Sequence, residues 1–150
     1  LEESLERGQY ATFVPSKKEP VYNWLYYKEG FSKELVFWLI DYFKSQSSNN
    51  ESEVSKKLNL VLDPFCGVGT TLLACKQNGI SSIGYDVQPS AVFASFVKTR
   101  DYDAEELKQQ VKMLLKKKFT RMKGDFPPLF HRAFSKYALE DIVFFREEIL

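Results

Sequence analysis

The chain has 150 residues and a formal net charge of +1 at pH 7; 44% of its residues are hydrophobic and 27% are charged. The hydrophobic share suffices for a core, no apolar run approaches the roughly 18 residues of a membrane span, and the near-neutral charge gives no sign of a globally basic nucleic-acid-binding domain. Two cysteines cannot make a disulfide framework, which favours a reducing compartment and a cytoplasmic location.

The first predicted element is a helix over residues 31–40. Ser32 is its expected N-cap, and Phe31 is expected to pack on Val36 one turn later. Apolar residues surround nearly the whole helix, which indicates burial rather than an amphipathic surface position. The polar, low-complexity stretch that follows predicts a surface loop at residues 45–57.

Aromatic residues are concentrated around this helix, between residues 22 and 43. A platform on which bases stack is one interpretation. A core is the favoured one, because aromatic side chains bury large areas. Only the tyrosines before the helix, Tyr22 to Tyr27, are expected to keep a surface role.

The most informative stretch joins a strand, a glycine turn and a helix. An apolar run from Leu60 ends in Asp63, two glycines separated by one residue follow, and threonines open a helix predicted at residues 70–78 with Gly79 after its end. This order is typical of a βα turn that holds a small ligand.

Two common ligands of such turns are disfavoured. The dinucleotide fingerprint requires a third glycine where this chain has Leu72, and a carboxylate at Asp63 would face the pyrophosphate across a low-dielectric gap. The phosphate-binding loop of nucleotide hydrolases requires a lysine, and none lies between Leu58 and Cys75. A ligand without phosphate fits better.

A second strand is predicted at residues 82–85, and it ends in Asp86, 17 residues beyond Gly69. In a parallel βαβ unit this spacing brings Asp86 to the tip of the strand next to the first one, where a carboxylate can accept hydrogen bonds from both hydroxyls of a ribose. Pro89 suits the first turn of a second helix. A loop acid that binds nothing is the alternative, and the preceding glycine turn argues against it.

At these two segments the chain resembles the class I S-adenosylmethionine-dependent methyltransferases, and among them the enzymes that methylate exocyclic amines of DNA bases. Residues 63–71, Asp-Pro-Phe-Cys-Gly-Val-Gly-Thr-Thr, differ from the commonest form of the family motif only at Val68. Residues 83–89 are similar to the family's Ile-Gly-x-Asp/Glu-x-Asn-Pro segment, with Gln88 in place of asparagine. The resemblance implies an α/β, Rossmann-like class I fold.

The resemblance also implies a set of residues that bind S-adenosylmethionine. Asp86 is expected to bind the ribose, the turn from Gly67 to Gly69 to approach the methionine portion, and Phe65 with Val87 to flank the cofactor. The start of the upstream helix is expected to touch the methionine end. The whole expected set is Lys28, Phe31, Asp63, Pro64, Phe65, Cys66, Gly67, Gly69, Thr70, Thr71, Asp86 and Val87.

Two other chemistries are not supported by the residues. Cys66 belongs to the cofactor turn and not to a base-facing loop, so a role as the nucleophile of cytosine-C5 methylation is rejected. His131 is the single histidine and there is no cysteine cluster, so no metal site is predicted.

Seven positive charges fall within the 16 residues from Lys108 to Lys123, late on a predicted helix. Asp103 is the expected N-cap of that helix, with Glu106 three residues later. A solvated helix end whose charges complement the helix dipole explains this pattern. Contact with nucleic-acid phosphates is the alternative, and it would make binding depend on salt.

The catalytic motif of the resembled enzymes is Asp, Asn or Ser, then Pro-Pro and an aromatic residue. The only Pro-Pro here, Pro127-Pro128, lies between Phe126 and Leu129 and is predicted to be a turn, so the catalytic residues are unknown. A final helix is predicted from Ser135, its expected N-cap. Its expected apolar stripe is Ala138, Ile142, Phe145 and Ile149.

Only two strands are convincing, whereas the resembled fold has about seven. Residues 1–150 are therefore expected to form a single cofactor-binding domain, or the N-terminal part of a longer methyltransferase with an incomplete sheet and extra C-terminal helices. The remainder would come from a further segment or from a second chain. An uncovered sheet edge predicts that the isolated chain self-associates or is marginally stable.

The sequence thus favours the cofactor-binding part of a DNA methyltransferase acting on an exocyclic amine of adenine or cytosine, with DNA as partner and no membrane. The first alternative is an RNA methyltransferase of the guanine-N2 type, because related glycine turns occur in such enzymes. The second is a non-catalytic cofactor-binding subunit of a split enzyme, because the catalytic motif is missing.

Overall fold

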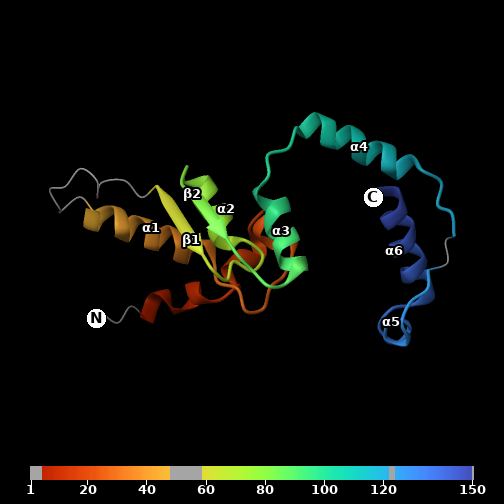
Figure 1. The fold of residues 1–150 in the computed structure, drawn as a ribbon, viewed down its shortest axis with the longest axis horizontal. Coiled ribbons are helices and arrows are strands. Elements are labelled where there is room, and N and C mark those ends of the chain that lie inside the picture. The colour runs from red at the N-terminus through yellow and green to blue at the C-terminus, as the bar shows by residue number, and fades with distance from the viewer. Residues whose placement is uncertain (1–4, 48–58, 122–123, 150) are drawn as a thin grey trace. The chain divides into compact units, whose positions relative to one another are not determined.

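A computed structural model describes residues 5–47, 59–121 and 124–149. The chain divides into two compact units, Leu1–Arg100 and Asp101–Leu150 (Figure 1). In the described ranges no helix combines the length and the apolar character needed to cross a membrane.

The centre of the first unit is a pair of parallel strands. β1 (Leu60–Asp63) and β2 (Ser81–Gly84) pair in register from Leu60 opposite Ser81 to Asp63 opposite Gly84. β1 begins where the sequence predicts it, and β2 begins one residue before its predicted start. These are the only strands in the described residues.

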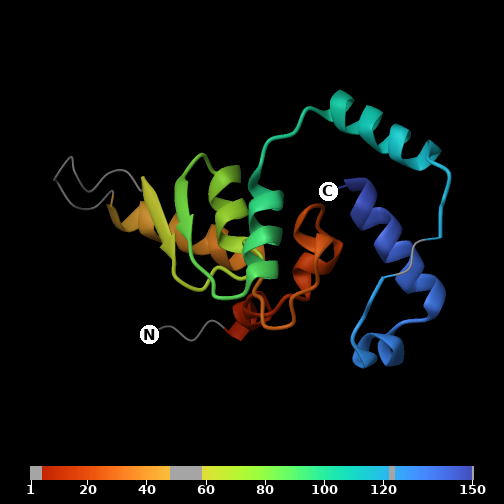
Figure 2. The same ribbon diagram turned by 45° about the vertical axis from the view of Figure 1, so that its right-hand side comes forward.

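The connection between the strands is helix α2 (Thr70–Gln77), visible beside β1 and β2 in Figure 2. Gly69 is its N-cap residue, and the helix ends one residue before its predicted end. Gly79 follows with a φ of +65°, a left-handed conformation that glycine adopts without steric cost and that commonly terminates helices. The predicted strand–turn–helix–strand order is therefore confirmed.

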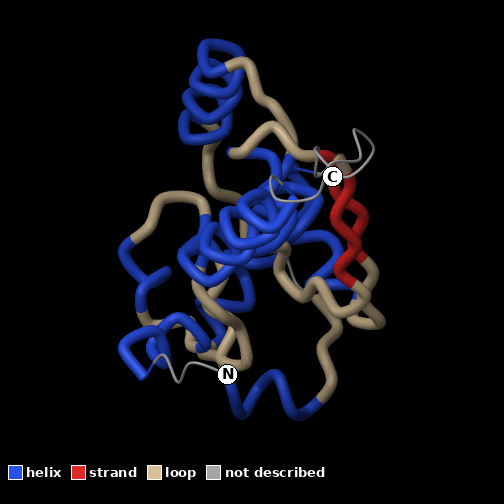
Figure 3. The backbone as a smooth tube through the Cα atoms, turned by 90° about the vertical axis from the view of Figure 1, so that its left-hand side faces the viewer, coloured by secondary structure: helices blue, strands red, loops and turns tan. Residues whose placement is uncertain are grey.

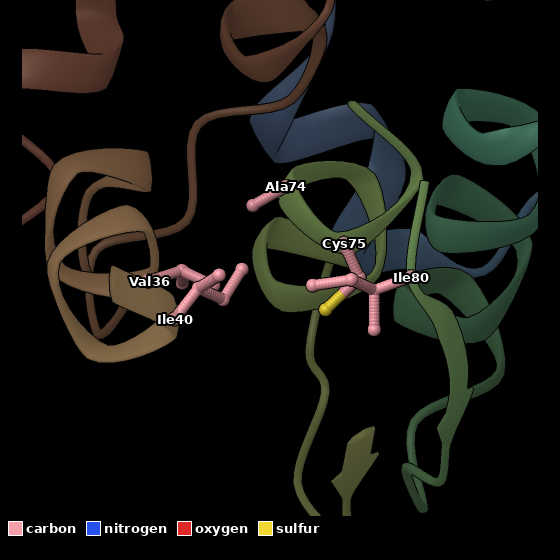
Figure 4. Packing of buried hydrophobic residues seen from close by; sticks show 5 residues of the cluster. All are labelled: Val36, Ile40, Ala74, Cys75 and Ile80. Atoms are coloured by element: carbon pink, nitrogen blue, oxygen red, sulfur yellow. The ribbon is translucent and has the colours of Figure 1, made fainter. Parts of the chain in front are cut away.

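Helix α1 (Lys33–Ser47) packs on α2 to form the core. Val36 and Ile40 face α2 across the interface in Figure 4. On the other side lie Ala74, Cys75 and Ile80, all buried. Because apolar packing of this kind removes the side chains from water, it is the main stabilising contribution in this unit.

Two expectations for α1 are wrong. Tyr42 and Phe43 are 47% and 52% exposed, so the predicted core position of the aromatic residues is wrong for these two. The Ser32 hydroxyl is buried and has no hydrogen-bond partner within the described part of the chain, so α1 starts at the predicted place without a side-chain cap. The helix runs to Ser47, and the remainder of the predicted loop lies outside the described residues.

The N-terminal segment is tied to the rest of the first unit through Tyr22. From residue 5 on, where its description starts, it contains three short 3-10 helices, Leu5–Ala11, Pro15–Lys18 and Tyr22–Trp24. The hydroxyl of Tyr22 donates to Gln77 Oε1 at 2.8 Å, and the Tyr22 carbonyl accepts from Lys98 Nζ at 3.2 Å. Tyr22 is 2% exposed, so the predicted surface role is wrong for this tyrosine.

Lys98 belongs to helix α3 (Pro89–Thr99), which opens with the predicted proline. Its ammonium is buried against a carbonyl oxygen, and burial lowers the pKa of Lys98 because a charged ammonium is poorly solvated there. Burial is also the main reason why the pKa of Tyr22 is raised, since the phenolate would be poorly solvated. Tyr22 and Lys98 therefore hold the N-terminal segment in place mainly by hydrogen bonding and packing.

The second unit contains three helices in its described part, α4 (Ala104–Lys116), α5 (Pro128–Ala133) and α6 (Lys136–Ile149). Pro127 and Pro128 do not form an isolated turn as predicted. They open α5 instead, because the fixed φ of proline suits the first helical position, where no N–H is needed.

Helix α6 begins as predicted but buries a different face. Ser135 Oγ accepts from the Ala138 N–H at 3.2 Å, which confirms the N-cap. The buried residues are Leu139, Glu140, Val143 and Phe144. Three residues of the predicted buried stripe are exposed: Ile142 at 45%, Phe145 at 42% and Ile149 at 66%. The predicted stripe is therefore wrong, and the buried face is displaced from it by about one residue along the chain.

The Asp103 cap allows a test of how the start of helix α4 is stabilised. One carboxylate oxygen of Asp103 accepts from the backbone N–H groups of Glu105 and Glu106 at 2.8 and 3.1 Å. Asp103→Ala is expected to lower the free energy of unfolding by about 1 kcal/mol, because two N–H groups at the helix start lose their acceptor. Urea unfolding followed by circular dichroism measures it. Asp125→Ala, an exposed aspartate outside any helix, is the control, and equal effects of the two changes would contradict the capping role.

Candidate functional site

The candidate site lies at the carboxyl ends of β1 and β2. Asp63 is the last residue of β1, and its carbonyl accepts from the Tyr85 N–H at 2.9 Å. The Tyr85 carbonyl in turn accepts from the Cys66 N–H at 2.9 Å, so backbone pairing continues past both strand ends. Asp63 and Asp86 are thereby held at the same edge of the sheet, as the spacing predicts.

The carboxylate of Asp86 fastens the glycine turn to the second strand. Its Oδ2 accepts from the Gly67 N–H at 2.9 Å and its Oδ1 from the Gln88 N–H at 2.8 Å. An ionised carboxylate offers about four acceptor positions, so roughly two remain for a ligand. The Asp63 carboxylate is likewise oriented by a backbone N–H, because its Oδ1 accepts from the Phe65 N–H at 3.0 Å.

The turn itself depends on glycine. Gly67 and Gly69 have φ values of +50° and +80°, in the left-handed region that side chains rarely adopt. A Cβ atom at Gly69 would lie 2.4 Å from Ser95 Oγ and 3.0 Å from Ser95 Cα, so α3 packs directly against the turn. A Cβ at Gly84, near the tip of β2, would lie 2.8 Å from Cys66 Cβ. The second strand therefore also requires a glycine to approach the turn.

The remaining residues of the predicted turn divide into two groups by exposure. Phe65 is 85% exposed and Val87 is fully exposed, so both present apolar side chains to solvent. Pro64 is exposed as well. In contrast, Cys66, Thr70 and Thr71 are buried beneath the turn.

Cys66 lacks the properties of an activated thiol. Burial, and then the negative charges of Asp63 and Asp86, raise the pKa of the Cys66 thiol, because both effects disfavour the thiolate. A thiol that stays protonated is a weak nucleophile. In addition, the described part of the chain contains no group of three or more His, Cys, Asp or Glu side chains suited to a metal ion.

The two upstream residues predicted from the helix start are placed differently. Phe31 lines an apolar cavity of about 300 Å³ together with Val61 of β1 and Thr71 of α2, so it lies close to the start of α2. Lys28 is exposed to solvent.

Sequence reasoning missed Tyr27 as a member of the site. A Cβ atom on Gly67 would lie 3.1 Å from Cε1 of Tyr27, so the tyrosine ring packs against the glycine turn. Tyr27 adjoins Lys28 in the chain, but nothing in its local pattern distinguishes it from the neighbouring tyrosines. The long-range packing of the N-terminal segment alone brings it to the turn.

This arrangement suits a ligand of particular chemistry. Two carboxylates favour hydroxyl groups and cationic groups, and they disfavour phosphates. The first N–H groups of α2 have no partner within the helix and favour a carboxylate. Exposed apolar side chains beside Asp86 can cover the faces of a flat ring.

Comparison with known proteins points to one family. A family model described as DNA methylase, of the N6/N4 class, matches residues 51–97. The chain is 34% identical over 138 residues to the type II methyltransferase M.BsoBI of Geobacillus stearothermophilus, an alignment that spans 89% of this chain and 25% of that protein. It is 39% identical over 89 residues to the type II methyltransferase M.AvaI of Nostoc sp., spanning 59% of this chain and 16% of the relative.

A third relative, from an archaeon, agrees with these two. The type II methyltransferase M.MjaII of Methanocaldococcus jannaschii is 35% identical over 97 residues, which are 63% of this chain and 17% of that protein. The chain thus spans a quarter or less of the length of the relatives it matches. No solved structure matches it significantly.

Proposed function

Because this chain is related to the amino-methylating DNA methyltransferases, we propose that its first unit binds S-adenosylmethionine at the carboxyl ends of β1 and β2. In the complete protein, this unit is the cofactor-binding part of a Rossmann-like class I enzyme that methylates an exocyclic amine of adenine or cytosine in DNA. The observation that carries the proposal is the pair of carboxylates, Asp63 and Asp86, held at the carboxyl ends of neighbouring strands beside a glycine turn.

The geometry of Asp86 fits the ribose of the cofactor. Two of its acceptor positions are filled by the Gly67 and Gln88 N–H groups, which fix the orientation of the carboxylate. The two that remain match the two adjacent hydroxyls of a ribose. Phe65 and Val87 are exposed apolar side chains of the same two segments and are suited to contact the adenine ring.

The methionine end of the cofactor fits the other side of the turn. Its ammonium suits Asp63, whose Oδ2 accepts no backbone N–H from the residues that the structure describes. Its carboxylate suits the unpaired N–H groups at the start of α2. Tyr27, packed on Gly67, and Phe31, beside Thr71, then limit the space around this end.

One side of the sheet is uncovered, which is consistent with the chain being part of a larger protein. Parallel sheets are normally covered on both faces, because their connecting helices lie on both sides. Here Leu60, Leu62 and Ile83 are 55%, 61% and 43% exposed, and Figure 3 shows the strands running along the side of the helices. We therefore expect a further segment or a second chain to cover these side chains and to complete the sheet.

The reaction of the complete protein would be a direct transfer. S-adenosylmethionine, when bound, would supply the methyl group: the exocyclic amine of a base would form a bond to the methyl carbon while the bond from that carbon to the sulfonium sulfur breaks, and the amine would lose a proton. The role of this unit is to hold the donor in place, because positioning accounts for much of such catalysis. The base would have to leave the duplex stack to reach the methyl group.

Calorimetric titration of the chain with S-adenosylmethionine, beside NAD, tests the proposal. We expect saturable binding of S-adenosylmethionine alone, since the turn lacks the features that hold a pyrophosphate. Binding of NAD in its place would contradict the proposal. Failure of a longer form of the protein, with a complete sheet, to bind S-adenosylmethionine would contradict it as well.

A further inference from the structure

The second unit lies outside the region that the family model matches. The match ends at residue 97, and the second unit begins at Asp101. The cofactor site described above is therefore contained in the first unit. The main chemical feature of the second unit is its charge: from Lys108 to Lys123, seven residues are positive and none is negative.

Three of these positive charges form a row on helix α4. Lys108, Lys112 and Lys116 are four residues apart, so they lie on one face of the helix, about 6 Å from one to the next along its axis. No residue of α4 is buried. Lys118 follows the C-cap residue of the helix, Lys117, and is exposed as well. We call Lys108, Lys112, Lys116 and Lys118 the basic face.

The basic face is separate from the apolar side of the helix. Leu107, Val111 and Leu114 line a groove of about 390 Å³ together with Ile149 of α6. With 3.6 residues per turn, Lys112 is turned by about 100° from Val111. The lysines therefore remain in solvent, while Leu107, Val111 and Leu114 line the groove next to α6.

Most of the basic face is not neutralised by acids. Lys108 pairs with Glu105 at 2.7 Å, but both side chains are exposed, so this pair is weak. Elsewhere in the segment, Lys117 pairs with Glu148 and Arg121 with Glu140. Within the described residues Lys112, Lys116 and Lys118 form no ion pair. Their charges are therefore available to an external polyanion.

We propose that the basic face binds the phosphate backbone of double-stranded DNA. The inference rests on the proposed function, in which the substrate is DNA, and it adds the surface that holds this substrate. A strand of B-DNA carries one phosphate about every 3.4 Å of helix axis, so a row of about 12 Å runs past roughly three or four of them. Such contacts position the duplex and carry no sequence preference.

The test is the salt dependence of DNA binding by the full chain. Fluorescence anisotropy with a labelled duplex of about 30 base pairs, between about 50 and 200 mM salt, gives the slope of log K against log salt concentration. Each phosphate contact contributes about 0.9 to that slope. The variant Lys112→Gln/Lys116→Gln/Lys118→Gln is expected to lower its magnitude by about 2.7.

A variant of equal charge is the control. Lys18→Gln/Lys44→Gln/Lys136→Gln changes three exposed lysines elsewhere and is expected to leave the slope unchanged. The inference is overturned if both variants lose the same slope, if the first variant keeps the parent slope, or if the parent chain does not bind the duplex. It is also overturned if the first variant loses binding only to phosphatidylglycerol vesicles or only to RNA. Titration of each variant with S-adenosylmethionine reports separately on the proposed function.

Discussion

Asp86→Ala is expected to weaken the binding of S-adenosylmethionine by at least about 100-fold, because hydrogen bonds from the ribose to a charged acceptor contribute about 1.5–3 kcal/mol each. The change also removes the acceptor of the Gly67 N–H, which holds the glycine turn against β2. Calorimetric titration of the variant and the parent chain measures the loss. Asp86→Asn keeps one carbonyl oxygen, so its affinity for S-adenosylmethionine is expected to lie between those of Asp86→Ala and the parent chain.

A matched aspartate separates this effect from a general loss of charge. Asp141 is exposed on α6 in the second unit, and Asp141→Ala is expected to bind S-adenosylmethionine like the parent chain. Thermal unfolding of all variants verifies that they are folded. If the Asp86→Ala variant is folded and binds S-adenosylmethionine with unchanged affinity, Asp86 does not contact the cofactor.

Gly69→Ala is expected to lower the free energy of unfolding by about 2–5 kcal/mol. The added methyl group would lie 2.4 Å from Ser95 Oγ and 3.0 Å from Ser95 Cα, and overpacking of a dense interior costs about 1–3 kcal/mol. The φ of +80° adds about 1–2 kcal/mol for a residue with a Cβ atom. Urea unfolding measures the sum.

Two other glycines divide this sum into its parts. Gly79 also has a positive φ, but no atom lies within 4 Å of the position that an added Cβ would take, so Gly79→Ala reports the backbone contribution alone. Gly8 has open space around it and an ordinary backbone, so Gly8→Ala is expected to change little. The double variant Gly69→Ala/Ser95→Gly is expected to recover part of the loss. If the Gly69→Ala and Gly79→Ala variants are equally destabilised, the close approach of Gly69 to Ser95 of α3 does not contribute to the free energy of unfolding.

The site could be predicted from the sequence where it is local in the chain. The strand before Asp63, the glycines of the turn and the Asp103 cap each depend on neighbours within a few residues, whose chemistry determines the backbone. Asp86 is more distant, but the fixed geometry of a parallel βαβ unit made its position predictable.

The parts that were missed depend on contacts between distant segments. The burial of Tyr22 results from hydrogen bonds to residues 55 and 76 positions away, and no local pattern reveals them. Tyr27 reaches Gly67 by the same route. On α6, periodicity identified a helix with apolar residues on several sides, but the face that is buried depends on what packs against it, as at Val143.

The anchoring of Tyr22 also bears on how the chain folds as it is made. During synthesis Tyr22 leaves the ribosome before its partners Gln77 and Lys98, which follow 55 and 76 residues later. Until then Tyr22 has neither of these hydrogen bonds, and closing so long a loop before contacts form slows folding. We therefore expect this segment to dock only after α3 has emerged.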